Sequence, residues 1–129
     1  MFDGTRGDDV LSGTPFKDFL DGYGGNDEVF GLQGPDLLRG EVGNDHLNGG
    51  PGADVLVGGP GNDVVNGGDG NDRVIVERGH DRVSAGGGND LIEGVNRSRD
   101  VISCGPGRDT VFADPNDRVA RDCERVRRG

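Results

Sequence analysis

The sequence predicts an all-β fold, a β-solenoid in which two nine-residue units form each coil of about 18 residues. Aspartate recurs every nine residues from Asp9 to Asp90. An apolar residue follows each of these aspartates by two positions, and glycine precedes each by two positions except at Phe16. A repeat this regular indicates short units that stack on one another.

Composition shows why stacking is needed. Only 30% of the 129 residues are hydrophobic and 5% are aromatic, so a conventional globular core is hard to build. The net charge of −10 disfavours nucleic acid and anionic membrane surfaces as partners, and it favours cations. No apolar run approaches the length that a membrane-spanning helix needs, so we expect no membrane span.

Each unit divides into a six-residue turn that ends in aspartate and a three-residue strand. Only the middle strand residue is consistently apolar, as expected for a short strand with one buried face. The turn glycines permit positive φ and let main-chain carbonyls approach a bound group closely. The predicted inward column is Leu11, Leu20, Val29, Leu38, Leu47, Leu56, Val65, Val74, Val83 and Ile92.

Two units per coil place the aspartates along two edges of the solenoid. Neighbouring carboxylates on one edge would lie roughly 4.8 Å apart. At that distance two like charges repel by about 3–4 kcal/mol, even at an effective dielectric near 20. Cations are therefore expected between them, and calcium fits best because it accepts 6–8 oxygen ligands in flexible geometry, whereas magnesium requires a stricter octahedron. One edge carries Asp9, Asp27, Asp45, Asp63 and Asp81, and the other carries Asp18, Asp36, Asp54, Asp72 and Asp90.

Three consecutive units at residues 49–75, GGPGADVLV, GGPGNDVVN and GGDGNDRVI, resemble the nonapeptide G-G-x-G-x-D-x-U-x of the repeats-in-toxin (RTX) family. The resemblance covers residues 4–93, with the best repeats at 22–93. It implies a right-handed parallel β-roll in which each calcium lies between two turns of one edge. We therefore predict a calcium-binding roll over residues 1–93, followed by degenerate repeats and a cap over residues 94–129.

The calcium ligands follow from this resemblance, which suggests about six ions. A first group of carboxylates is Asp27, Asp45, Asp63, Asp81, Asp36, Asp54, Asp72 and Asp90. A second group lies in less regular units: Asp9, Asp18, Asp100 and Asp109. In the Asp18 unit Phe16-Lys17 replaces Gly-Asn, and Thr5 and Thr14 replace second glycines. Main-chain carbonyls of the turns are further candidates, at Gly50, Gly52, Gly59, Gly61, Asn62, Gly68, Gly70, Asn71 and Gly88.

The repeat weakens after Gly94, where Asp100 follows Asp90 by ten residues. The last coil of a solenoid exposes an apolar cross-section and unpaired strands, so a terminal cap is expected, and residues 117–126 are the candidate. The two cysteines of the chain, Cys104 and Cys123, both lie in this last part. A disulfide between them would stabilise the cap by roughly 3 kcal/mol; the alternative is two reduced, buried thiols.

The predicted function is calcium-coupled folding of a secreted bacterial module, whose export signal is not in this chain. Enzyme activity is not expected, because His46 and His80 fall at different repeat offsets and no H-E-x-x-H motif occurs. The alternative is an ice-binding or adhesive surface, for which Asn26, Asn44 and Asn62 form a row along one edge.

An outward apolar stripe offers a further interaction surface. Phe19, Leu37 and Val55 occupy the first strand position in successive coils of one edge. The stripe either covers the face of the roll or binds a second copy or another protein partner.

Overall fold

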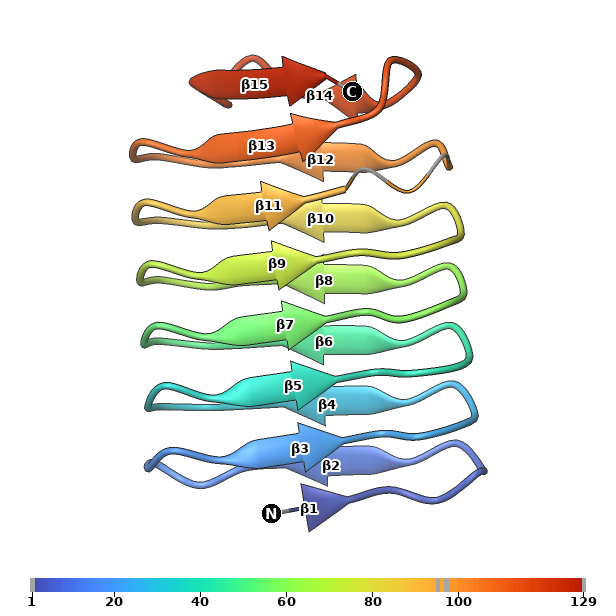
Figure 1. Ribbon diagram of the computed structural model, residues 1–129. Helices are drawn as coiled ribbons and strands as arrows, with labels where there is room; N and C mark the ends of the chain where they lie inside the picture. Colours follow the sequence, from blue (N-terminus) through green and yellow to red (C-terminus); the bar gives the residue numbers. More distant parts are fainter. Residues whose placement is uncertain (1, 95, 97, 129) are drawn as a thin grey trace.

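The chain winds into a right-handed coil of two parallel β-sheets lying back to back (Figure 1). The computed structural model describes residues 2–94, 96 and 98–128; the predicted ranges also contain residues 1, 95, 97 and 129, which lie outside the described residues. Odd-numbered strands run in one direction on the near side, and even-numbered strands return on the far side. The described residues include no helix, so none of them forms a helix that could cross a membrane.

The near sheet has eight strands and the far sheet has seven, and every strand pairs in parallel with the strand one coil away. The eight-stranded sheet contains β1 (Phe2–Asp3), β3 (Phe19–Asp21), β5 (Leu37–Arg39), β7 (Val55–Val57), β9 (Arg73–Ile75), β11 (Leu91–Glu93), β13 (Thr110–Ala113) and β15 (Arg125–Arg128). The seven-stranded sheet contains β2 (Val10–Ser12), β4 (Glu28–Phe30), β6 (His46–Asn48), β8 (Val64–Asn66), β10 (Arg82–Ser84), β12 (Val101–Ser103) and β14 (Arg118–Val119). The predicted all-β solenoid is confirmed.

Paired strand residues are 18 positions apart over most of the chain, and this separation changes near the C-terminal end. Val64 pairs with Arg82, two units later, as the period requires. Arg82 then pairs with Val101, and Thr110 with Arg125. The extra or missing residues fall in the turns, so the middle residues Ile102 and Val111 remain buried, whereas Val126 in the terminal strand β15 is exposed. The predicted boundary between residues 93 and 94 stays a prediction, because the stack of strands continues across it.

The core is a single column of inward side chains between the two sheets. Because successive strand residues point to opposite faces, only the middle residue of each three-residue strand enters this column. Nine of the ten predicted inward residues are buried: Leu20, Val29, Leu38, Leu47, Leu56, Val65, Val74, Val83 and Ile92. Leu11, in the first complete coil, is only partly buried. Val76, Ala85, Cys104 and Ala113 extend the core near its C-terminal end.

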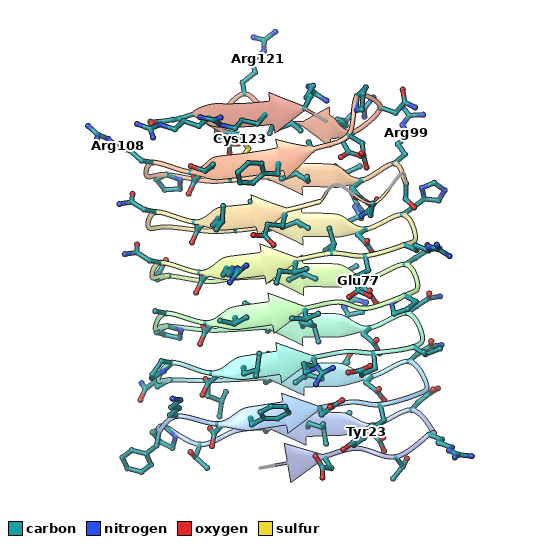
Figure 2. All side chains as sticks on the ribbon, viewed as in Figure 1. Tyr23, Glu77, Arg99, Arg108, Arg121 and Cys123 are labelled. Carbon is teal, nitrogen blue, oxygen red and sulfur yellow. A yellow bond between two sulfur atoms is a disulfide. The ribbon has the colours of Figure 1, made fainter. Side chains whose placement is uncertain are left out.

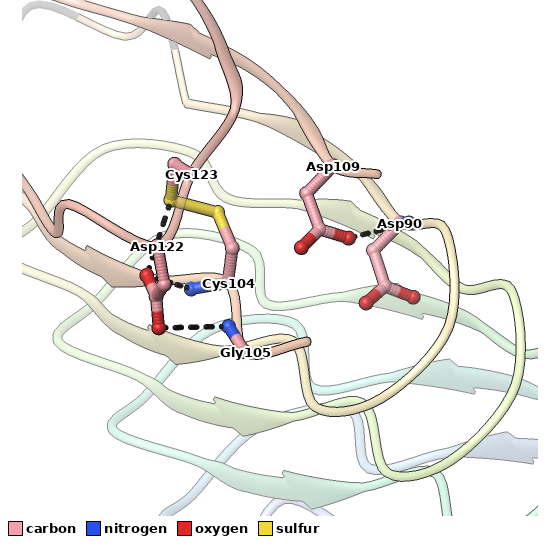
Figure 3. Close-up of a disulfide and its surroundings, with 6 residues drawn as sticks. All are labelled: Asp90, Cys104, Gly105, Asp109, Asp122 and Cys123. Atoms are coloured by element: carbon pink, nitrogen blue, oxygen red, sulfur yellow. Dashed lines mark hydrogen bonds between the residues drawn. A yellow bond between two sulfur atoms is a disulfide. The ribbon is translucent and has the colours of Figure 1, made fainter. Parts of the chain in front are cut away.

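The predicted disulfide is present. Cys104 and Cys123 are joined, with their Cα atoms 5.1 Å apart. The carboxylate of Asp122 accepts hydrogen bonds from the backbone N–H groups of Cys104 and Gly105, at 3.1 and 3.0 Å (Figure 3). The bridge thus holds the last loop against the preceding turn, and β15 completes the stack beside β13.

Candidate metal site

The turns of successive coils stack backbone against backbone. Numbering each unit from its first turn residue, the aspartate is position 6 and the strand occupies positions 7 to 9. Gly61, at position 4, has a φ of 125°, and a Cβ there would overlap the carbonyl oxygen of Gly43 in the coil before. Only glycine permits this conformation together with so close an approach. Main-chain oxygens are therefore concentrated along each edge.

The position-6 aspartates are bound into these edges by one carboxylate oxygen. In each stacked pair, Oδ1 accepts a hydrogen bond from the backbone N–H of the aspartate one coil earlier, for example Asp45 to Asp63 at 2.8 Å. The same bond joins Asp27 to Asp45, Asp36 to Asp54, Asp54 to Asp72, Asp63 to Asp81, Asp72 to Asp90, and Asp90 to Asp109 (Figure 3). The aspartates are consequently fixed in orientation and buried.

Among the residues that the structure describes, nine aspartates have a second carboxylate oxygen that is buried without any hydrogen-bond partner. These Oδ2 atoms belong to Asp27, Asp36, Asp45, Asp54, Asp63, Asp72, Asp81, Asp90 and Asp109. They include the whole first group predicted from the sequence and one residue of the second group. A buried carboxylate oxygen without a donor is costly, and a row of them indicates that positive charge from outside the polypeptide belongs there.

In six of these nine units position 1 is glycine, which leaves a space beside the Oδ2 atom; in the units of Asp81, Asp90 and Asp109 the same position is Val76, Ala85 and Cys104. A Cβ at Gly49 would lie 2.6 Å from Oδ2 of Asp54 and 2.6 Å from the carbonyl oxygen of Gly67, one coil later. At Gly40 the same two distances, to Asp45 and Gly58, are 2.6 and 2.8 Å. Carboxylate and carbonyl oxygens thus converge on a space that any side chain would fill. This oxygen-only donor set suits calcium.

The nine predicted main-chain ligands are also available. Within the part of the chain that the structure describes, none of their carbonyl oxygens accepts a hydrogen bond; they belong to Gly50, Gly52, Gly59, Gly61, Asn62, Gly68, Gly70, Asn71 and Gly88. Other turn carbonyls are occupied, since the position-3 carbonyl of Pro60 accepts from Gly43 and the carbonyl of Asp45 accepts from Val64. The stack therefore leaves the predicted carbonyls free for a ligand.

Burial changes the acidity of the carboxylates. Desolvation raises the pKa of Asp63 and Asp72 to about 8; the N–H of the aspartate one coil earlier lowers it in part, and neighbouring carboxylates raise it again. The pKa values of Asp45, Asp54 and Asp81 rise to about 7, with desolvation again the largest cause. Desolvation also raises the pKa values of Asp27, Asp36, Asp90, Asp100 and Asp109. Without a cation, the row of buried aspartates therefore resists full ionisation at neutral pH.

In three less regular turns, neighbouring protein groups donate hydrogen bonds to the second carboxylate oxygen of the aspartate. The backbone N–H and hydroxyl of Thr14 donate to Oδ2 of Asp18 at 2.5 and 3.0 Å, and Thr5 does the same for Asp9. The side-chain amide of Asn96 donates to Oδ2 of Asp100 at 2.9 Å. These three aspartates belong to the second group predicted from the sequence.

Two structural roles of asparagine were not predicted. Asn96 lies in the ten-residue unit, and its amide also donates to the carbonyl of Val76 at 3.2 Å, so it joins two coils. At position 5, Oδ1 of Asn44 accepts from the N–H of Asn62 at 2.8 Å, and such bonds repeat along the edge. The recurrence of asparagine at position 5 was the available signal for this ladder.

Fold and turns together define a class of protein, a parallel β-solenoid with acidic, oxygen-rich turns stacked along both edges. The sequence profile of the RTX calcium-binding nonapeptide repeat matches the chain four times, at residues 3–38, 30–65, 39–74 and 66–94. These matches cover more than half of the chain, which therefore belongs to the RTX calcium-binding nonapeptide repeat family. Repeats of this family bind calcium. No curated protein matches the chain.

Proposed function

We propose that the chain is an extracellular bacterial module that folds when calcium fills the spaces between its stacked turns. The row of buried, unpartnered Oδ2 atoms carries this proposal. Six of these oxygens lie beside the space left by a position-1 glycine, and a divalent cation would neutralise two neighbouring carboxylates. RTX repeats are typical of secreted bacterial proteins, which is consistent with this setting.

The ions are assigned to neighbouring aspartates that both have an unpartnered oxygen. On one edge the pairs are Asp27/Asp45, Asp45/Asp63 and Asp63/Asp81, and on the other they are Asp36/Asp54, Asp54/Asp72, Asp72/Asp90 and Asp90/Asp109. These pairs correspond to about seven ions, one more than the repeat pattern alone suggested. Asp9, Asp18 and Asp100 are left out because Thr5, Thr14 and Asn96 already donate to their Oδ2 atoms.

Folding is coupled to calcium because the row of buried aspartates destabilises the roll when no cation is bound. Closely spaced aspartates with pKa values raised to about 7 or 8 oppose formation of the ion-free roll at neutral pH. Calcium binding supplies the missing stabilisation, and sites of this kind in extracellular modules have dissociation constants of about 0.1–1 mM. Cytosolic calcium, which is far lower, would leave the chain unfolded and ready for export.

Neither an enzyme nor an ice-binding surface receives comparable support. His46 and His80 are both exposed and lie in different coils, and Nδ1 of His80 lies 2.9 Å from the carbonyl oxygen of Arg99. In the row proposed for ice binding, the side-chain oxygens of Asn26 and Asn44 accept backbone hydrogen bonds within the roll. That row therefore serves the stack, and we propose a non-catalytic calcium-binding role.

Circular dichroism with calcium and with excess chelator tests the coupling, and calorimetric titration tests the number of ions. We expect a β spectrum with calcium, a largely disordered spectrum in chelator at neutral pH, and about seven bound ions. A chelated protein that retained its full β spectrum would refute calcium-coupled folding. A much lower ion count with normal folding would refute only the assignment of the pairs.

A further inference from the structure

The outer faces of the two sheets differ. The eight-stranded sheet, seen from its outer side in Figure 2, carries adjacent apolar side chains over its central strands. Its half-buried apolar residues are Phe19, Leu37, Val55, Val57, Ile75, Leu91 and Phe112. On the seven-stranded sheet, polar residues such as His46, Asn48 and Arg82 separate the apolar ones. One face of the roll is therefore the better candidate for burial against a partner.

Charges on the apolar face are ordered along the solenoid axis. Asp3 lies exposed at the N-terminal end, in β1, whereas Arg125 and Arg127 lie in β15 at the opposite end. Between them, β5 carries Arg39 and β11 carries Glu93. Since β5 and β11 are equally far from the middle of the sheet, reversing the order of the strands exchanges their places.

We propose that this face binds the same face of a second copy, with the two solenoid axes antiparallel. A two-fold axis along the strand direction, between β7 and β9, would place β5 opposite the partner's β11 and β7 opposite the partner's β9. Arg39 would then face a glutamate, Leu37 a leucine, and Val57 an isoleucine; these partners are Glu93, Leu91 and Ile75 of the second copy. A parallel arrangement would instead place β5 opposite the second copy's β5, which carries no acidic residue.

Existing ion pairs are compatible with this contact. Within one copy a guanidinium nitrogen of Arg39 lies 2.7 Å from a carboxylate oxygen of Glu41, and Arg73 and Glu93 approach to 3.1 Å. These side chains are partly exposed, so they remain accessible to a second copy. Contact between Arg39 and Glu93 across the interface would join the two pairs into one network of alternating charge.

The acidic and basic ends also match in the antiparallel arrangement. β1 would lie opposite β15, so that Asp3 faces Arg127 across the interface at both ends of the dimer. In the parallel arrangement the two acidic ends would lie together, and so would the two basic ends. Charge complementarity thus selects one orientation of the second copy.

The size of the face sets the strength of the association. Eight strands about 4.8 Å apart and three residues long give a face of about 34 by 10 Å. Two such faces bury less than the roughly 1,200 Å² typical of the smallest stable interfaces. A reversible dimer is therefore expected, half formed at protein concentrations on the order of 100 μM.

Sedimentation velocity over a concentration series in calcium tests the dimer, with two matched variants. Val55 and Val64 both occupy position 7 and are both half-buried, but they lie on opposite sheets, in β7 and β8. Arginine already occupies this position at Arg73 and Arg82, so the roll accommodates it. Val55→Arg should weaken dimerisation at least tenfold because it would face the partner's Arg73, whereas Val64→Arg should leave it unchanged.

Exchanging the charges of Arg39 and Glu93 tests the antiparallel orientation of the two copies. This test does not require the Val55→Arg variant to fold. Arg39→Glu or Glu93→Arg alone should weaken the dimer, and the double variant should restore it, with circular dichroism confirming the folded roll in each case. A wild-type protein that remains monomeric at about 1 mM would overturn the proposal. Equal effects of the two valine variants would exclude this face, and failure of the double variant to restore dimerisation would exclude the antiparallel arrangement.

Discussion

Replacing Asp72 with alanine should disrupt calcium binding at two places in the middle of the roll. The carboxylate of Asp72 is fixed by the N–H of Asp54 at 2.9 Å, and the N–H of Asp72 in turn donates to Asp90 at 2.8 Å. Its Oδ2 is buried without a partner, so it belongs to the proposed sites on both sides. The substitution therefore removes a ligand from two ions and a hydrogen bond from the stack.

The expected magnitude follows from mass action. At calcium ten times above the dissociation constant, each bound ion stabilises the fold by about 1.4 kcal/mol, so losing two ions costs about 3 kcal/mol. The calcium midpoint of folding should rise at least twofold, and because each coil stabilises its neighbours, the loss should spread along the stack. Calcium titration followed by circular dichroism measures the midpoint, and calorimetry should count about two fewer ions.

Asp18→Ala is the matched control. Both oxygens of Asp18 accept hydrogen bonds from Thr14, and the residue lies near the end of the stack. Its loss should cost about 1 kcal/mol locally and leave the ion count unchanged. Equal midpoint shifts for the two variants, or a larger shift for Asp18→Ala, would refute the assignment of calcium to the unpartnered carboxylates.

Three further predictions concern pH, the glycine of position 4 and the disulfide. In chelator the roll should become more stable on acidification, because burial raises the pKa of Asp63 in the folded protein to about 8. The stability that protonation of Asp63 contributes is complete below the unfolded pKa near 3.8 and is lost as pH rises through about 8. Circular dichroism from pH 3 to 9 checks this, and a β signal that grows with pH in chelator would contradict it. Gly61→Ala should weaken calcium-coupled folding because its Cβ would overlap the carbonyl oxygen of Gly43 in the stacked turn, whereas Gly7→Ala, at the same repeat position but with nothing closer than 3.6 Å to its Cβ, should not; calorimetric titration of both variants compares them. Replacing both Cys104 and Cys123 with serine should lower the free energy of unfolding by about 3 kcal/mol while leaving the ion count unchanged, and an abolished calcium response would show that the cap is needed to form the sites.

The architecture could be predicted from the sequence because the repeat is strict. A middle apolar residue in every three-residue strand can be buried only if strands stack, and the nine-residue period determines which residues face inward. The aspartates fall on two edges for the same reason. Leu56 and Asp54 illustrate this, since both are buried as the period requires. For the cysteines the sequence left two alternatives, and the disulfide depended on the loop that returns Cys123 to Cys104.

Which carboxylates lack a donor was decided by the tertiary structure. Asp18 and Asp72 occupy the same repeat position, yet only Asp18 has a threonine hydroxyl beside its second oxygen. Oδ2 of Asp100 accepts a hydrogen bond from Asn96, which lies in a ten-residue unit that departs from the nine-residue period. Asp109, in an equally irregular part of the chain, keeps an unpartnered oxygen. Periodicity determines the edge on which a carboxylate lies, but its hydrogen bonds depend on the path of each turn and on the coils stacked above and below it.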